Sequence, residues 1–125
     1  MRRIILGLSV AVLAAAPAFA ADDIMTGYYG NTVVSSGGMF TANTHYRADH
    51  SFDVVGSGMG MTKTFKGTWA IDGKGQLCRT YVGDTPPGLP SNPFCTAWEA
   101  HKAGDKWTVS MGGNTRDLEL KSGVQ

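Results

Sequence analysis

The sequence predicts an all-β protein, a small antiparallel meander that closes into a barrel or a half-open, barrel-like sheet. Three observations support this fold class. Apolar and polar residues alternate with a period of two through most of the chain, as expected when successive side chains point to opposite faces of a strand. Glycine is frequent, with 17 residues spread along the sequence, and it favours tight turns. About seven or eight short strands are indicated, and most of their connections are short.

The N-terminal 20 residues have the pattern of a cleavable secretory signal peptide. Two arginines follow Met1, an uncharged apolar run extends over Ile4–Ala16, and small residues surround a cleavage site after Ala20. The run is shorter than the roughly 20 residues that span a bilayer, which favours cleavage over a retained membrane anchor. We therefore expect a signal peptide at 1–20, a single β-barrel-like domain at 21–125 without a membrane span, and a periplasmic or secreted location.

The charge balance of the mature chain excludes some classes of partner. Cleavage removes two of the eleven basic residues, which leaves nine against ten acidic residues. The formal net charge of the mature chain is then −1, and no basic stripe remains that would favour nucleic acid or an anionic membrane surface. A small-molecule ligand or a protein of the cell envelope is the partner that we expect.

The first element of the mature chain is expected to be one helical turn at Asp22–Thr26, which Gly27 and Gly30 end early. Period-two alternation predicts strands after it. The expected strands are, in chain order, 40–47, 51–55, 61–71, 76–82, 94–101, 106–111 and 116–120.

Glycine and proline mark the connections between these strands. Gly56–Gly60 predicts a bend or bulge, and Asp72–Gly75 predicts a hairpin turn that requires positive φ. Gly83–Pro93 contains four prolines and no periodicity, so it is expected to be a loop.

Two cysteines, Cys78 and Cys95, belong to the mature chain. In an oxidising compartment such a pair usually forms a disulfide, worth about 3 kcal/mol at this spacing in the chain-entropy treatment. A free thiol or a metal ligand is the alternative, but the pair lacks C-x-x-C spacing. Both cysteines alternate with the apolar Leu77 and Phe94, so the disulfide is expected on the opposite face of neighbouring strands, at the base of the Pro-rich loop.

One group of residues resembles the pattern of a family of small exported bacterial β proteins of unknown function. In that pattern a G-x-W strand leads through a D-G turn into an L-C strand, and a second cysteine and a G-D-x-W turn follow. The matching residues are Gly67, Trp69, Asp72, Gly73, Gly75, Leu77, Cys78, Cys95, Gly104, Asp105 and Trp107. The resemblance implies a lipocalin-like antiparallel barrel and no known catalytic residues. The Pro-rich insert between the cysteines departs from the family's pattern.

Five residues are candidates for binding a small ligand inside the barrel. Lys63 and Arg79 occupy positions on the apolar side of their strands, and a cation among aromatic residues suits a small anionic ligand. Tyr46, Tyr81 and Trp98 are expected to line the same cavity. The alternative is that the two cations lie at the rim of the barrel and extend into water.

Neither a metal site nor a cofactor is expected from the histidines. His45, His50 and His101 share no ligand spacing on one element, and alternation places His45 and His101 on polar faces, which predicts solvent-facing rings. Asp53 could form an acid–base pair with His45 or His50, but no motif of a known catalytic class supports it.

Met59 and Met61 form an M-x-M pattern with two interpretations. Methionine thioethers are soft ligands that select Cu(I). Both residues also share a face with Phe65 and Trp69, where a flexible apolar side chain would fill the core.

Three functional hypotheses follow. The leading one is an exported binding or interaction module with a cavity for a small anionic or aromatic ligand, which displays the Gly83–Pro93 loop. The second is a cofactor-independent enzyme that uses tyrosine, histidine or arginine inside a lipocalin-like barrel. The third is a periplasmic copper-handling protein.

Overall fold

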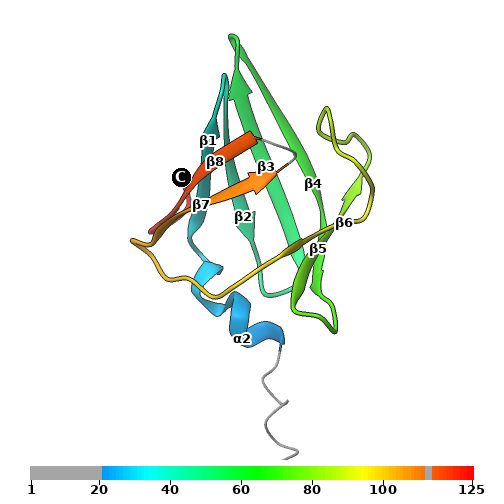
Figure 1. Ribbon diagram of the computed structural model, residues 1–125, viewed down its shortest axis with the longest axis vertical. Coiled ribbons are helices and arrows are strands. Elements are labelled where there is room, and N and C mark those ends of the chain that lie inside the picture. The colour runs from blue at the N-terminus through cyan, green and yellow to red at the C-terminus, as the bar shows by residue number, and fades with distance from the viewer. Residues whose placement is uncertain (1–20, 112–113) are drawn as a thin grey trace, which may run out of the picture.

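The computed structural model describes residues 21–111 and 114–125 and has the predicted all-β fold, a curled half-barrel of antiparallel strands (Figure 1). The predicted signal peptide at 1–20 lies outside the described residues, as do residues 112 and 113 of the last predicted turn. Within the described ranges, no helix has the length and apolar character needed to cross a membrane.

A short helical segment precedes eight strands. Helix α2 (Ala21–Met25) runs directly into the 3-10 turn η3 (Thr26–Tyr28), close to the predicted helical turn. The strands are β1 (Thr32–Gly37), β2 (Phe40–Tyr46), β3 (Ser51–Gly58), β4 (Met61–Ile71), β5 (Gln76–Val82), β6 (Phe94–Ala97), β7 (Lys106–Met111) and β8 (Asn114–Lys121). The predicted bounds of β4, β5 and β7 agree with the structure.

The strands form one sheet in the order β6-β5-β4-β3-β2-β1-β8-β7, with every neighbouring pair antiparallel. Strands β1 to β6 are a meander. The chain then crosses the open side of the sheet, and the β7–β8 hairpin joins the far edge of β1 (Figure 1). The sheet therefore ends at β6 and β7, and the barrel stays open along the seam between these two edges.

Five of the eight described strands differ from the sequence prediction. Strand β2 ends at Tyr46, one residue before the predicted bound, and β8 extends the predicted 116–120 at both ends. Strand β1 was not predicted, because two valines followed by two serines show no alternation, yet β1 pairs with both β2 and β8. The bend predicted at Gly56–Gly60 is wrong over its first half, since β3 continues to Gly58, which pairs with Met61. Strand β6 ends at Ala97, four residues earlier than predicted.

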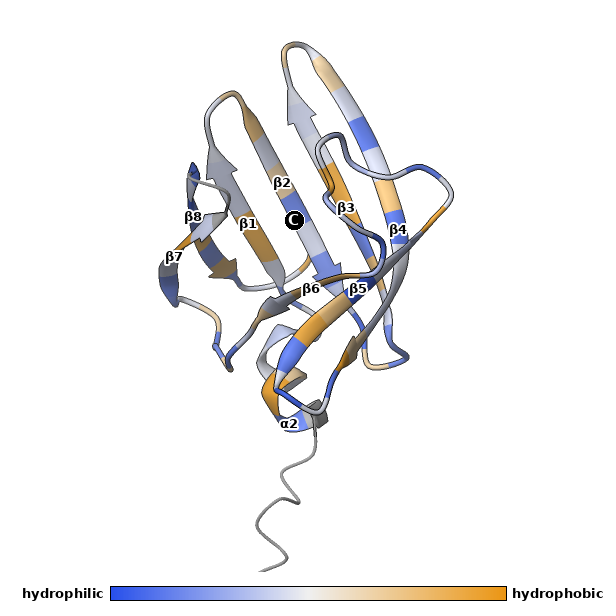
Figure 2. Cartoon of the chain, turned by 45° about the vertical axis from the view of Figure 1, so that its right-hand side comes forward, coloured by the Kyte–Doolittle hydropathy of each residue, from blue (hydrophilic) through white to orange (hydrophobic). Residues whose placement is uncertain are grey.

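The core lies on the concave face, at the end of the half-barrel that α2 and η3 cover (Figure 2). Met25 and Tyr28 are the contribution of this segment, and both are buried. The other buried members of the cluster are Val33, Tyr46, Phe52, Trp69, Leu77 and Leu120. The indole N–H of Trp69 donates to the carbonyl of Arg47 at 2.9 Å. This packed end leaves the opposite half of the concave face available for a pocket.

Candidate ligand-binding site

A pocket of about 600 Å³ occupies the concave face beyond the core. All strands except β4 contribute residues to its wall, and Pro86–Pro90 of the β5–β6 loop form another part of it. Such a volume is within the range of small-molecule sites, which are mostly apolar with a few polar groups. The aromatic wall residues are Tyr46, Tyr81, Phe94 and Trp98.

The structure brings four of the five predicted ligand residues to this pocket, namely Tyr46, Arg79, Tyr81 and Trp98. They come from β2, β5 and the segment after β6. Lys63 lies elsewhere: its side chain is 58 % exposed, and its ammonium group is 3.3 Å from the carboxylate of Asp84. The ammonium also lies 5.5 Å from the ring centroid of Phe65. The side chain of Lys63 thus extends into water, as the alternative interpretation expected of both cations, whereas Arg79 lines the pocket.

Arg79 provides a positive charge inside the pocket. Its Nε donates to the phenol oxygen of Tyr46 at 2.8 Å, and its guanidinium carbon lies 5.2 Å from the ring of Trp98. Within the described part of the chain it has no ion pair with a carboxylate. An arginine is charged at any physiological pH, so the pocket holds a cation without a counter-ion from the protein.

Arg116 is a second pocket arginine, which the sequence analysis did not single out. It could have been found, because alternation along β8 places Arg116 on the face of Leu118 and Leu120. Its guanidinium donates to the Ser35 hydroxyl at 2.6 Å and to three backbone carbonyls, those of Ser35, Gly37 and Phe40. Arg116 therefore ties β8 to β1 and β2, whereas Arg79 has one hydrogen bond within the described ranges.

The remaining polar groups of the wall are neutral. Burial raises the pKa of Tyr81 above its ordinary value, an effect that the charge of Arg79 offsets only in part. The Tyr81 hydroxyl is therefore protonated at neutral pH and available as a donor. Thr96 Oγ1 and Trp98 Nε1 are enclosed in the wall without a hydrogen-bond partner among the described residues. Unpartnered buried polar atoms are uncommon in proteins, so each of these two calls for an explanation, such as a bound water or ligand.

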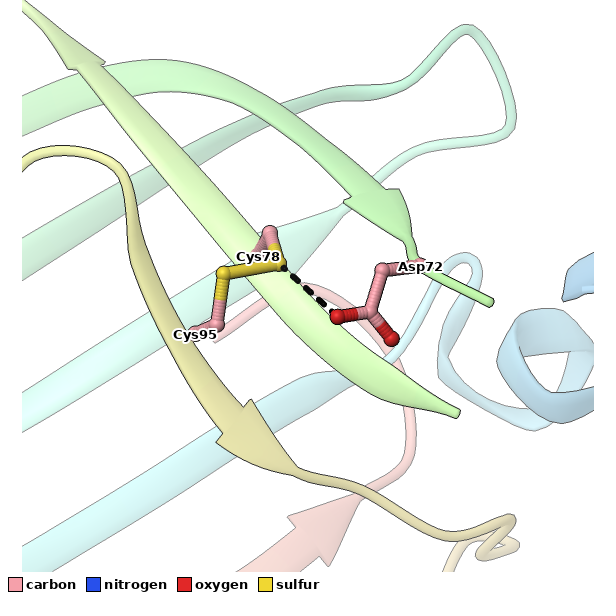
Figure 3. Close-up of side chains that lie close together, drawn as sticks. All are labelled: Asp72, Cys78 and Cys95. Carbon is pink, nitrogen blue, oxygen red and sulfur yellow. Dashed lines mark hydrogen bonds between the residues drawn. A yellow bond between two sulfur atoms is a disulfide. The ribbon is translucent and has the colours of Figure 1, made fainter. Parts of the chain in front are cut away.

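The loop at 83–93 is tied to the strands on both sides of it. The Asn92 side chain accepts from the backbone N–H of Tyr81 at 2.8 Å and donates to its carbonyl at 3.1 Å, so it continues the pairing of β5 beyond β6. The predicted disulfide joins Cys78 to Cys95, which are paired across β5 and β6 (Figure 3). These constraints hold the prolines of the loop over the pocket.

The carboxylate of Asp72 lies 3.9 Å from the sulfur of Cys78 (Figure 3). A disulfide sulfur carries no proton, so this is a contact rather than a hydrogen bond. Among the described residues, Asp72 and the two cysteines are the only group of three histidine, cysteine, aspartate or glutamate side chains close enough together to hold a metal ion. The disulfide removes the thiolates that such a site needs, and the group remains structural.

The prediction that His45 and His101 face the solvent is wrong. His45 is 8 % exposed, and its Nδ1 lies 2.8 Å from the carboxylate of Asp53. The side chain of His101 is 12 % exposed and lies between Glu99 and Asp105, at 3.1 and 3.0 Å. The His45–Asp53 pair was considered as an acid–base pair, but Nε2 of His45 is enclosed, so this ring does not reach a substrate in the observed conformation.

Comparison of the chain with known protein families, with characterised proteins and with solved structures finds no significant match.

Proposed function

We propose that the protein is an exported binding module that holds a small anionic compound with an aromatic or apolar body on the concave face of its half-barrel. One observation carries the proposal: an aromatic pocket of about 600 Å³ has two arginines and no acidic residue among its described lining residues. A cation that lacks a counter-ion in a partly desolvated wall attracts an anion more strongly than it would in water. The aromatic and proline side chains supply apolar surface for the rest of the ligand.

The composition of the wall favours binding over catalysis. Among the residues that the structure describes, the lining contains no histidine, aspartate, glutamate, lysine or cysteine. These residue types carry most acid–base and nucleophilic chemistry near neutral pH. The enzyme hypothesis would need tyrosine or arginine alone to perform the chemistry, so a binding module is the better supported function.

Export and the lipocalin-like architecture remain part of this proposal. The basic, apolar and small-residue segments of 1–20 fit a signal peptide. The disulfide between Cys78 and Cys95 is consistent with an oxidising compartment. A curled antiparallel sheet around a pocket supports the likeness to lipocalin-like barrels, and a periplasmic or secreted location follows from these points together.

The proposal is tested with two fluorescent probes that differ in charge. The mature, oxidised protein is titrated with 1-anilinonaphthalene-8-sulfonate, an anion, and with N-phenyl-1-naphthylamine, its uncharged counterpart. We expect saturable binding of the anion, weakened about 10- to 150-fold by Arg79→Met, which is the loss of one charge-assisted hydrogen bond worth about 1.5–3 kcal/mol. The uncharged probe should bind the variant and the wild type alike.

Lys63→Met is the matched control, because it removes a cation that does not line the pocket. It should leave the binding of both probes unchanged. Equal weakening by Lys63→Met and Arg79→Met would show that only the overall charge matters. Failure of the wild type to bind the anionic probe would also contradict the proposal. Near-UV circular dichroism verifies that each variant is folded, since the anionic probe also binds partly folded states.

A further inference from the structure

Three methionines are among the most exposed large hydrophobic residues of the described chain. Met39, Met59 and Met61 are 65 %, 71 % and 72 % exposed. The interpretation of Met59 and Met61 as core-filling residues is therefore wrong. Single exposed hydrophobic residues are normal on protein surfaces, but three of one type in one place call for an explanation.

The strand register places all three at neighbouring hairpin turns. Strands β1 and β2 pair as far as Gly37 and Phe40, which leaves Met39 in the turn, and β3 and β4 pair as far as Gly58 and Met61. Met59 lies in this second turn. Figures 1 and 2 show both turns at the end of the sheet opposite α2.

The two turns are in contact through their backbones. Strands β2 and β3 pair up to Thr41 and Ser57. One residue separates each of these from its turn. A Cβ atom added to Gly58 would lie 2.5 Å from the carbonyl oxygen of Met39 and 2.5 Å from the ring of Phe40. Met39 therefore lies beside the strand end that leads into Met59, although the two are twenty positions apart in the sequence.

The residue type at these turns is not explained by turn geometry. Tight turns favour glycine, asparagine and aspartate, whereas two of the methionines occupy turn positions. Met59 has φ = 52°, in the left-handed region that few residues other than glycine adopt. Methionine brings neither a turn preference nor buried area to this position, which leaves its thioether as the distinctive property.

We propose that Met39, Met59 and Met61 form a binding site for a soft monovalent metal ion, Cu(I) or its redox-inert analogue Ag(I). Thioether sulfur is a soft ligand that prefers Cu(I) over harder cations. Three rotatable bonds allow each exposed side chain to turn its sulfur toward the others. This site is separate from the proposed pocket and does not depend on it.

The ligand chemistry makes a distinctive prediction about pH. Metal affinity normally falls in acid because histidine, cysteine and carboxylate ligands must lose a proton. A thioether has no proton to lose. The affinity of the Met39–Met59–Met61 site for Ag(I) should therefore change less than about twofold between pH 5.5 and 8. A site made of histidines would bind much more weakly at pH 5.5 than at pH 8.

The test uses the mature, oxidised protein labelled with ¹³C at the methionine methyl groups and titrated with Ag(I). We expect one ion per chain, shifted methyl signals for Met39, Met59 and Met61, and an unchanged signal for Met25, which is buried at the other end of the half-barrel. Each single Met→Leu variant should weaken binding by about tenfold or more, since loss of even an outer-shell partner costs about 10- to 100-fold. The triple leucine variant should not bind.

Phe40→Leu is the control, because Phe40 is exposed at the same turns and offers no sulfur. It should bind Ag(I) as the wild type does. Unmoved methyl signals, Ag(I) binding by the triple variant, or an affinity that falls at pH 5.5 would each overturn the proposal. The proposal would also be overturned if the methyl signals shift with phosphatidylglycerol vesicles but not with Ag(I). The turns would then bind a membrane surface rather than a metal ion. The triple variant should still bind the anionic naphthalene probe, which separates this proposal from the pocket.

Discussion

The replacement Arg79→Met separates a functional role of this arginine from a structural one. Methionine keeps an unbranched apolar stem and has no charge, so it retains the part of the packing that the stem of Arg79 makes and removes the cation. If Arg79 exists to bind an anion, its loss should weaken the binding of the anionic probe without destabilising the fold. If Arg79 is structural, the free energy of unfolding should fall instead.

The contacts of Arg79 set the expected size of the effect on stability. The variant loses the hydrogen bond to Tyr46, worth about 1.5–3 kcal/mol because its donor is charged, and the contact with the Trp98 ring, worth about 0.5–1 kcal/mol. The variant also no longer pays the desolvation penalty of an unpaired cation. This penalty is several kcal/mol for a fully buried ion and less for the half-buried Arg79. These contributions oppose each other, so the free energy of unfolding should stay within about 1 kcal/mol of the wild type.

Arg116→Met provides the comparison inside the same pocket. Its removal leaves one hydroxyl and three carbonyl groups without their charged donor. This should cost about 3–5 kcal/mol, less than the sum of four charge-assisted hydrogen bonds because water replaces the donor where these groups are exposed. Urea unfolding followed by tryptophan fluorescence measures both variants. A loss of more than about 2 kcal/mol for Arg79→Met, with binding of the anionic probe unaffected, would refute the assignment of Arg79 as the anion-binding residue.

Three further predictions concern stability. Replacing Cys78 and Cys95 together by serine should lower the free energy of unfolding by about 3 kcal/mol, which a urea titration against the oxidised wild type measures. Hydrogen bonds, first of all from the backbone of Lys102, lower the pKa of Asp105 to about 2. The Asp105 carboxylate therefore stabilises the fold above about pH 4, and this stabilisation is lost as the pH falls toward 2. Asp105→Asn should reduce the loss of stability between these pH values, as measured by unfolding at each pH. Gly67→Ala places a Cβ 1.9 Å from a backbone oxygen of β5 and should cost about 2–3 kcal/mol, whereas Gly73→Ala, in open space, should cost much less in the same assay.

Alternation predicted most strands but could not predict β1. Strands β4 and β5 alternate over their full length, so both their bounds and their faces could be predicted. In β1 the interior positions are Val33 and Ser35, and the outward positions are Val34 and Ser36. Each face therefore holds one apolar and one polar residue, so the two faces of β1 do not differ in hydropathy and alternation gives no signal for a strand.

Alternation also predicted which side chains share a face, but not which of them meet. Alternation assigns Arg79 and Trp98 to the inner face. The contact between the two side chains depends on the curl of the sheet and on the path of the chain across its open side, which alternation does not describe. Lys63 was assigned to the same face, but its position on β4 extends past the end of the pocket toward Asp84. The position of the Pro-rich loop over the pocket could not be predicted from periodicity, because it depends on side-chain contacts such as those of Asn92.

The open seam between β6 and β7 determines how the interior can respond to ligands of different size. In a closed barrel, a wider interior requires broken ladder hydrogen bonds or a changed strand register. Here β6 and β7 are not paired with each other in the part of the chain that the structure describes, and residues of both strands line the pocket. No ladder hydrogen bond between these two described edges fixes the width of the interior, while Arg116 holds β8 to β1 and β2. For the ligand-binding function that we propose, selectivity would therefore rest on charge more than on a fixed diameter.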